Sequence, residues 1–225
     1  MRSFMNKAEI LAKADHTLLS QTATLDDILA IVDDGIKYGT ASVCIPSCYV
    51  ADAVKYANGR IPICTVVGFP NGNCTTEAKA AETEKALSDG AKEIDMVINI
   101  GMLRAGEDYK VCDEIRQIKK ACGDKILKVI IETCLLTEDE KLRMCKIVTD
   151  AGADYIKTST GFSTAGATLA DVKLMRANVG EKVLVKAAGG ISGLEDAQAF
   201  LDNGAARLGT SRVVKAVQGI AGKGY

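Results

Sequence analysis

Short apolar runs alternate with longer amphipathic stretches along nearly the whole chain. Runs rich in β-branched residues predict buried strands, and apolar residues spaced three or four positions apart predict helices. The predicted strands cover residues 14–18, 42–45, 63–68, 93–98, 127–132, 155–157, 183–187 and 207–208. The predicted helices cover residues 25–38, 48–57, 76–90, 107–121, 137–151, 169–179, 193–203 and 211–218, with a short extra helix at 7–13.

Several predicted helices end in the same way, with Gly90, Gly152 or Gly204 just before the next strand. Glycine is common there because it adopts the left-handed conformation that terminates a helix. Eight strand–helix alternations predict an α/β fold, a single (β/α)8 TIM barrel with a short extra N-terminal helix. An open doubly wound sheet is the alternative, but its usual G-x-G-x-x-G fingerprint is absent. No linker-like segment divides residues 1–225, so we expect one domain.

Composition excludes several partners. The 225 residues are 48% hydrophobic and 25% charged, as in ordinary soluble proteins. A formal net charge of −1 gives no electrostatic reason to expect nucleic acid or an anionic membrane as partner. No apolar run approaches the roughly 20 residues that span a bilayer, and the N-terminus lacks the features of a signal peptide. We therefore expect a cytoplasmic protein.

The eight cysteines do not form a pattern typical of metal binding. None form a C-x-x-C pair, and His16 is the only histidine, so we expect neither a metal site nor a Cys–His hydrolase. Cys44, Cys64, Cys134 and Cys145 lie in apolar stretches, where a reduced thiol acts as a small hydrophobic group.

Two lysines carry the strongest functional signal. Lys157 and Lys186 each end an apolar, strand-like run and lead into small or hydroxyl residues and glycine. A desolvated ammonium tends to lose its proton, and a second ammonium nearby acts in the same direction. Neutral lysine is a nucleophile toward carbonyl groups, so the pair indicates imine chemistry. The alternative is that each lysine extends to solvent with its stem packed on apolar surface.

Asp95 lies among apolar residues in the predicted strand 93–98. A carboxylate inside a barrel needs a cation, which lysines of nearby strands could supply. The pair is then either catalytic or purely structural. Chemistry in such barrels occurs at the carboxyl ends of the strands. Other polar residues near those ends are Asp15, Thr17, Cys44, Asn99, Glu132, Thr133, Thr158 and Ser159.

Glycines follow the last two predicted strands. Gly189 and Gly190 follow the seventh, and Gly209 precedes Thr210 and Ser211 after the eighth. Loops at these two places, with free backbone N–H groups, commonly bind phosphate in this fold. The two hydroxyls could cap the last helix or donate to the same anion. A plain turn is the alternative.

Six segments together resemble the deoxyribose-phosphate aldolase family, and the likeness runs nearly the whole length of the chain. The Lys-Thr-Ser-Thr-Gly run at 157–161 and the Lys-Ala-Ala-Gly-Gly run at 186–190, in that order and after the Asp95 segment, are the most specific. The segments are residues 15–19, 42–46, 67–72, 93–101, 157–162 and 185–191.

The resemblance implies a class I aldolase that reversibly cleaves 2-deoxyribose 5-phosphate to acetaldehyde and glyceraldehyde 3-phosphate. It implies that Lys157 forms the Schiff base, that Lys186 keeps Lys157 unprotonated, and that Asp95 belongs to the proton relay. The iminium ion is the electron sink, so this chemistry requires neither metal nor organic cofactor. The implied partners are small phosphorylated sugars and aldehydes.

The resemblance also implies the substrate-binding positions. The glycines and Ser211 would hold the phosphate, and Thr17 and Thr160 would lie near the sugar hydroxyls. Some relatives carry a lysine where this chain has Phe162, and several end in a tyrosine whose tail covers the site. The expected substrate-binding residues are Asp15, Thr17, Cys44, Thr160, Gly161, Gly189, Gly190, Gly209, Ser211 and Tyr225.

Two alternative functions stay open at this point. One is another Schiff-base aldolase or transaldolase that acts on a different sugar phosphate, with the same lysine and loops. The other is a non-catalytic barrel that binds sugar phosphates. Barrels of this size often pair, so a homodimer is possible.

Overall fold

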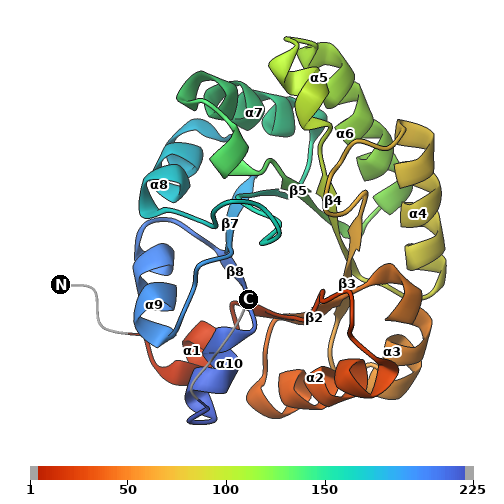
Figure 1. The fold of residues 1–225 in the computed structure, drawn as a ribbon, viewed down its shortest axis with the longest axis vertical. Helices are drawn as coiled ribbons and strands as arrows, with labels where there is room; N and C mark the ends of the chain where they lie inside the picture. Colours follow the sequence, from red (N-terminus) through yellow and green to blue (C-terminus); the bar gives the residue numbers. More distant parts are fainter. Residues whose placement is uncertain (1–4, 221–225) are drawn as a thin grey trace.

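In the computed structural model, which describes residues 5–220, eight parallel strands close into one barrel in chain order (Figure 1). This architecture confirms the predicted fold. The strands are β1 (Ala14–Thr17), β2 (Ser42–Ile45), β3 (Ile63–Val67), β4 (Glu93–Val97), β5 (Ile126–Ile130), β6 (Tyr155–Lys157), β7 (Leu184–Ala188) and β8 (Arg207–Thr210).

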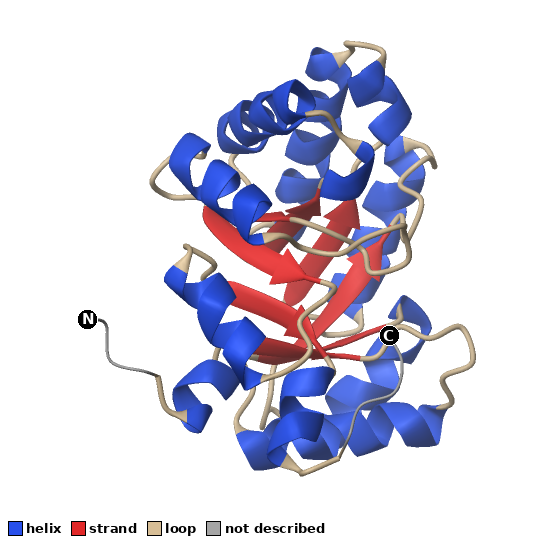
Figure 2. Ribbon diagram, turned by 60° about the vertical axis from the view of Figure 1, so that its left-hand side comes forward, coloured by secondary structure: helices blue, strands red, loops and turns tan. Residues whose placement is uncertain are grey.

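Helices surround the strands as an outer layer (Figure 2). All eight helices of the predicted alternation are present, and the extra N-terminal helix is α1 (Lys7–Leu11). The others are α2 (Leu25–Tyr38), α3 (Val50–Ala57), α4 (Thr76–Ser88), α5 (Ile100–Arg104), α6 (Asp108–Cys122), α7 (Glu138–Ala151), α8 (Leu169–Asn178), α9 (Leu194–Asp202) and α10 (Arg212–Val217). The sequence did not predict α5 or the 3-10 turns η1 (Ser47–Tyr49) and η2 (Thr133–Leu135), because such short elements show no periodicity.

Local signals fix where the helices begin and end. Thr24 and Thr137 start α2 and α7, and each side chain accepts a hydrogen bond from the third helical residue, whose carboxylate reaches back to the cap. These capping boxes satisfy backbone donors that the helix itself leaves free. Gly152 ends α7 with φ of 74°, and Gly90 and Gly204 also have positive φ, as the helix-end pattern predicts.

The apolar core lies between the barrel and the helices. Val32, Val43, Ile94, Ile115 and Met175, from both layers, are fully buried. Burial of such side chains between strands and helices is the main contribution to the stability of this fold. The interior of the barrel is different, because charged groups occupy much of it.

Candidate active site

Charged side chains meet inside the barrel. Arg207 on β8 reaches Glu93 on β4, on the opposite side of the barrel, with 3.2 Å between Nη1 and Oε2. Lys128 on β5 lies 2.5 Å from the same oxygen. Barrel interiors usually contain branched apolar residues, and buried charges need partners. This interior therefore supports chemistry at its carboxyl end as well as packing.

The three residues predicted to be catalytic lie together. Lys157 Nζ is 2.7 Å from Asp95 Oδ2, and Lys186 Nζ is 2.7 Å from the same oxygen. Lys186 also donates to Asp15 Oδ2. Lys157 and Lys186 are in register on the neighbouring strands β6 and β7, which brings the two ammonium groups to one carboxylate.

Two further cations belong to this cluster. Lys128 Nζ lies 2.9 Å from Asp95 Oδ1, and Arg207 Nη1 lies 2.5 Å from Asp15 Oδ1. Neither residue was predicted from the sequence. Lys128 shows the same signal as Lys157, a lysine in an apolar strand, and could have been found by it.

The cluster fixes the ionisation of its members. Burial alone would raise the pKa of Asp95, but Lys128, Lys157 and Lys186 outweigh it and hold that pKa well below its ordinary value. Burial alone would lower the pKa of Lys186, but Asp15 and Asp95 outweigh it and hold that pKa above the ordinary value. Opposite charges at hydrogen-bond distance favour both ionised forms. Lys186 is therefore a stable cation beside Lys157.

A cavity of about 210 Å³ opens above the cluster, bounded by the carboxyl ends of β1, β6, β7 and β8 and the loops that follow β6 to β8. Lys157 lines it, whereas Lys186 and Asp95 lie beneath and are fully buried. Seven of the predicted substrate-binding residues also line it: Thr17, Thr160, Gly161, Gly189, Gly190, Gly209 and Ser211. Lys157 is thus the single lysine of the cluster that lines the cavity.

The glycines allow the close packing of the cavity wall. Gly189 and Gly190 both have φ of 76°, a conformation that favours glycine. A Cβ on Gly166 would lie 2.4 Å from the carbonyl carbon of Gly189, so the loops after β6 and β7 touch backbone to backbone. A Cβ on Gly209 would lie 3.1 Å from Lys186 Cε. Glycine at these positions therefore leaves room for the lysine and for a ligand.

The hydroxyls of the wall differ in their partners. Thr17 Oγ1 donates to Asp15 O at 2.8 Å, and Thr210 Oγ1 donates to Ile191 O at 3.2 Å. Ser211 precedes α10 and makes no capping hydrogen bond with its side chain. The Ser211 hydroxyl is thus the most suitable of the three to bind an anion in the cavity.

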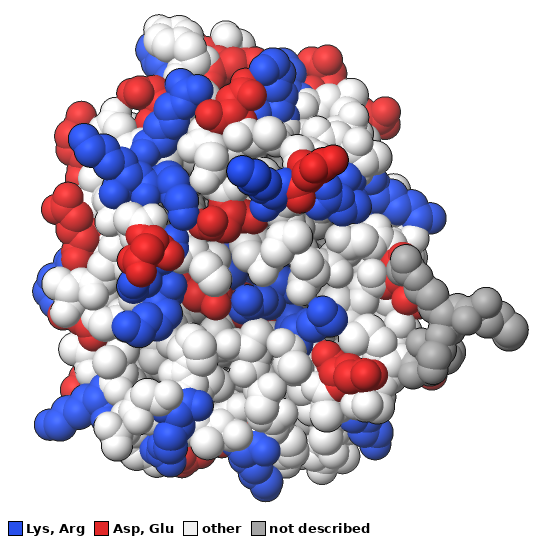
Figure 3. All heavy atoms as spheres, turned by 180° about the vertical axis from the view of Figure 1, so that it is seen from behind, with Lys and Arg blue, Asp and Glu red and all other residues white. Residues whose placement is uncertain are grey.

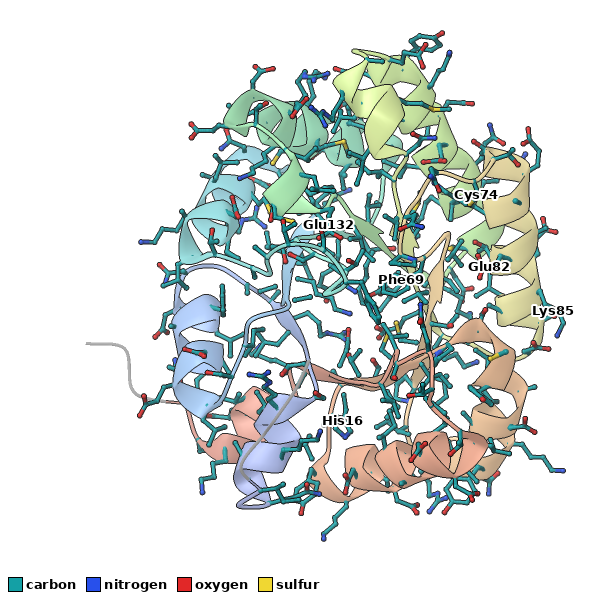
Figure 4. All side chains as sticks on the ribbon, in the orientation of Figure 1. His16, Phe69, Cys74, Glu82, Lys85 and Glu132 are labelled. Atoms are coloured by element: carbon teal, nitrogen blue, oxygen red, sulfur yellow. The ribbon has the colours of Figure 1, made fainter. Side chains whose placement is uncertain are left out.

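Glu132 fixes the loop that follows β6. Its carboxylate accepts hydrogen bonds from Thr160 N, at 3.2 Å to Oε1, and from Thr160 Oγ1. Thr160 Oγ1 in turn accepts from Phe162 N at 3.0 Å. Figure 4 labels Glu132 beyond the end of β5 and Phe69 beyond the end of β3. Glu132 has φ of 53°, uncommon outside glycine and consistent with a residue held by function. From the sequence, Glu132 was predicted only as a polar residue near the end of a strand.

Among the described residues, Asp15 and Cys44 were predicted to bind substrate but do not line the cavity. Asp15 lies beneath it and is bound to Lys186. Cys44 is fully buried in a small apolar cluster with Cys64, and a hydrogen bond from Cys64 lowers the pKa of its thiol. Tyr225 lies outside the described residues.

The carboxylates of the cluster are already bound to basic side chains. Among residues 5–220, two groups have potential ligand atoms within 4.8 Å of one another: Cys44, Cys64 and Asp95, and Asp15, Cys64 and Glu93. Lys128 and Arg207 bind these carboxylates, together with the two catalytic candidates. The positive charge that a metal would provide here is thus supplied by side chains.

The outer surface shows no segregated charge on the face seen in Figure 3, where basic and acidic side chains are interspersed. In the part of the chain that the structure describes, every helix is too short or too polar to cross a membrane.

A closed eight-stranded barrel with buried lysines and a carboxylate next to a cavity at the carboxyl ends of its strands has the architecture of a barrel enzyme. The chain belongs to the DeoC/LacD family of aldolases, whose family model matches residues 10–221. The chain is therefore an aldolase and a lyase by family.

Relatives from several bacteria carry one name. A deoxyribose-phosphate aldolase of Clostridium botulinum (strain Alaska E43 / Type E3) is 57% identical over 221 residues, covering 98% of this chain and 100% of the relative. One of Streptococcus pyogenes serotype M4 (strain MGAS10750) is 57% identical over 219 residues, covering 97% and 98%. The chain is thus similar to these enzymes over their full length.

A solved structure has the same fold. The deoxyribose phosphate aldolase from Aeropyrum pernix, described as a unique tetramer, superposes with a TM-score of 0.86 at 28% identity, covering 95% of this chain and 92% of that one.

Proposed function

We propose that this aldolase reversibly cleaves 2-deoxy-D-ribose 5-phosphate to acetaldehyde and D-glyceraldehyde 3-phosphate through an imine on Lys157. One observation carries the proposal. Lys157 is the single lysine of the buried cluster that lines the cavity, and its nitrogen lies 2.7 Å from Asp95. The relatives that share more than half of its sequence are named for this substrate.

The charges of the cluster favour a neutral Lys157. The cluster holds three carboxylates and four basic groups: Asp15, Glu93 and Asp95, and Lys128, Lys157, Lys186 and Arg207. One positive charge is in excess when all are ionised, and an uncompensated buried charge is unfavourable. Loss of the proton from Lys157, the lysine next to the cavity, leaves the charges balanced. The neutral amine that results is the nucleophile.

In the cleavage direction, the Lys157 amine attacks the C1 aldehyde of the open-chain sugar, and loss of water gives an iminium ion. The C3 hydroxyl loses its proton, and the electrons of the C2–C3 bond move toward the iminium nitrogen. D-Glyceraldehyde 3-phosphate leaves, and an enamine remains on the lysine. Protonation at C2 and hydrolysis of the new imine release acetaldehyde and restore the amine.

The surrounding residues have distinct roles in this proposal. Lys186 stays cationic and disfavours a second charge on Lys157, and Asp95 accepts and returns protons between Lys157 and the substrate. Thr17 and Thr160 line the cavity beside the sugar hydroxyls, and the glycine loops with Ser211 surround the phosphate.

Reductive trapping tests the proposal. Incubation with acetaldehyde and borohydride should add one ethyl group, which peptide mapping places on Lys157. The Lys157→Ala protein should gain none, and Lys146→Ala, which removes an exposed lysine paired with Asp150, should be trapped like the wild type. Absence of an adduct in the wild type, or an adduct that persists in Lys157→Ala, would reject the imine. Turnover of other sugar phosphates but not deoxyribose 5-phosphate would favour a different Schiff-base aldolase.

The proposal treats residues 1–225 as one domain that acts in the cytoplasm as a homodimer. The cytoplasmic assignment is supported by the eight cysteines, none of which forms a disulfide in the structure.

The dimer has a candidate contact surface, because Leu25, Leu29 and Tyr56 line an exposed groove on α2 and α3. Sedimentation equilibrium decides this point, because a mass near 23.7 kDa would mean a monomer.

A further inference from the structure

The cavity contains a second basic residue besides Lys157, and imine formation on Lys157 gives that residue no role. Of the described residues that line the cavity, only Lys157 and Arg212 are charged, and both are basic. No carboxylate of residues 5–220 lines it. Lys157 must be neutral to form the imine and cannot serve as a counterion. The positive charge that remains belongs to Arg212, at the start of α10.

The Arg212 side chain has no protein partner within the described residues. Its backbone N donates to Thr210 Oγ1 at 3.0 Å, which fixes the residue against the cavity wall. Its Nε is buried and makes no hydrogen bond, and Arg212 belongs to none of the ion pairs in residues 5–220. A buried donor without an acceptor is unfavourable, and buried polar groups are normally paired. An anion bound beside Arg212 in the cavity would give this side chain an acceptor.

The rest of the wall is suited to the same anion. Gly189, Gly190, Gly209 and Ser211 line the same cavity as Arg212, and Ser211 adds a hydroxyl. A phosphate monoester carries nearly two negative charges at neutral pH, and a guanidinium binds phosphate oxygens through two parallel hydrogen bonds. Neutral donors alone would leave most of that charge uncompensated.

The loop after β6 supplies no cation to this wall. Phe162 follows Gly161 in that loop, at the position where some relatives carry a lysine. Its ring packs edge-on against Phe69, with ring centroids 5.2 Å apart. The cavity therefore depends on the loop after β8 for positive charge.

We propose that Arg212 is the residue that makes this enzyme prefer phosphorylated over unphosphorylated sugars. It binds the phosphate of the substrate, and it acts on affinity rather than on the imine steps. This inference rests on the proposed function, because it assumes that the sugar phosphate enters the cavity next to Lys157.

The test compares 2-deoxyribose 5-phosphate with 2-deoxyribose as substrates of the wild type and Arg212→Gln. The ratio of their kcat/KM values should fall about 10- to 100-fold in the variant, as expected for loss of a charged donor, mainly through KM for the phosphorylated sugar. Arg212→Lys keeps the charge but loses the two parallel N–H donors of the guanidinium. Its ratio of kcat/KM values should therefore lie between those of Arg212→Gln and the wild type. Arg104→Gln, which removes an exposed arginine of α5 outside the cavity, should leave the ratio unchanged.

Inorganic phosphate supplies a readout that requires no turnover. Calorimetric titration should show weaker phosphate binding to Arg212→Gln than to the wild type. An equal fall for both sugars, or an unchanged ratio and unchanged phosphate binding, would overturn the inference while trapping at Lys157 still supports the proposed function. If trapping at Lys157 fails but Arg212→Gln still binds phosphate more weakly than the wild type, the proposed function is wrong and the anion site at Arg212 is supported.

Discussion

A single carboxylate oxygen, Asp95 Oδ2, accepts hydrogen bonds from two lysines. Lys186 is bound by a second carboxylate, Asp15, whereas Lys157 has Asp95 alone among the ion pairs of the described residues. The two lysines are thus alike in type and different in environment. The proposed function uses this difference: Lys186, with two carboxylate partners, keeps its charge, and Lys157, next to the cavity, is the proposed reactive amine.

Removal of the charge on Lys186 should change the pH dependence of the reaction. In Lys186→Leu, the cluster loses one of the cations that compete with Lys157 for Asp95, so the ammonium form of Lys157 becomes more favourable. We expect the acidic limb of the kcat/KM profile to move to higher pH. At pH 7 the rate should fall at least about 10-fold, and at alkaline pH much of it should return. Stopped assays across the pH range measure this directly.

The matched control is Lys186→Arg, which keeps a cation beside Asp95. Its acidic limb should stay closer to that of the wild type. A Lys186→Leu profile that is lower at every pH but not displaced would show that Lys186 acts by positioning and not by its charge.

At the scale of secondary structure, α4 and α6 are joined by a buried ion pair outside the barrel. Lys79 Nζ lies 2.7 Å from Glu114 Oε1 and donates to Val97 O at 2.8 Å. Glu114 Oε2 accepts from Asn99 N, which ties both helices to the end of β4. Burial raises the pKa of Glu114 in spite of the attraction of Lys79. Burial of the ionised Glu114 carboxylate is therefore unfavourable by itself, and the charge of Lys79 is needed to compensate for it.

Breaking this pair should be severe. Lys79→Met leaves Glu114 buried without a cation, and we expect the free energy of unfolding to fall by about 3–5 kcal/mol. Urea unfolding followed by circular dichroism measures the change. The Lys79→Met, Glu114→Leu double variant should recover most of the loss, because no charge is then left buried.

Lys85 on the same helix provides the control. It pairs with Asp89 but is 71% exposed, and Figure 4 shows it on the outer edge of α4. Lys85→Met should change the free energy of unfolding by less than about 1 kcal/mol. A loss in Lys79→Met no larger than in Lys85→Met would contradict the structural role of the buried pair.

The sequence predicted elements well where local signals are strong. The bounds of α2 are the predicted ones, since Thr24 and Gly39 mark its two ends. The predicted strand at 207–208 is too short by two residues, because Gly209 and Thr210 read as a turn although β8 continues through them. Glycine suits position 209 because the Lys186 side chain packs against the strand there and leaves little room for a Cβ.

The site was predictable only in part. Lys157 and Lys186 could be identified because each interrupts an apolar run. Their contact with Asp95 could be seen only in the closed barrel. Arg207 escaped because it begins a strand, where a charge is ordinary, and only the closed barrel brings it across to Glu93. Arg212 escaped because nothing in a sequence shows that a donor lacks a partner.

At the scale of the whole molecule, polar groups are buried in two layers. The inner layer is the charged cluster in the barrel. The outer layer includes His16, which is buried on β1 with Asp34 Oδ2 3.8 Å from its Nε2 (Figure 4). Burial lowers the pKa of His16, although Asp34 opposes this effect and Lys215 adds to it. Both layers make folding depend on pH, in different ranges.

Acid should therefore destabilise the protein in two stages. His16 has a lowered pKa when folded and a value near 6.5 when unfolded, so the unfolded chain binds its proton first and the free energy of unfolding declines as pH falls below about 6.5. Asp15 and Asp95 have depressed pKa values when folded, against about 3.9 when unfolded. Their contribution is present above about pH 4 and is lost as pH falls through and below it.

Urea unfolding from pH 7.5 to 3 separates the stages, and the single histidine permits a direct check by NMR. The His16 ring resonances should titrate below the ordinary value, and His16→Gln should lack the upper stage while it keeps the lower one. An unfolding free energy that is flat between pH 7 and 5, with His16 titrating near 6.5, would mean that its imidazole reaches water. A lower stage that is absent would mean that the carboxylates in the barrel gain nothing from their cations, and the electrostatic account of Lys157 would fail with it.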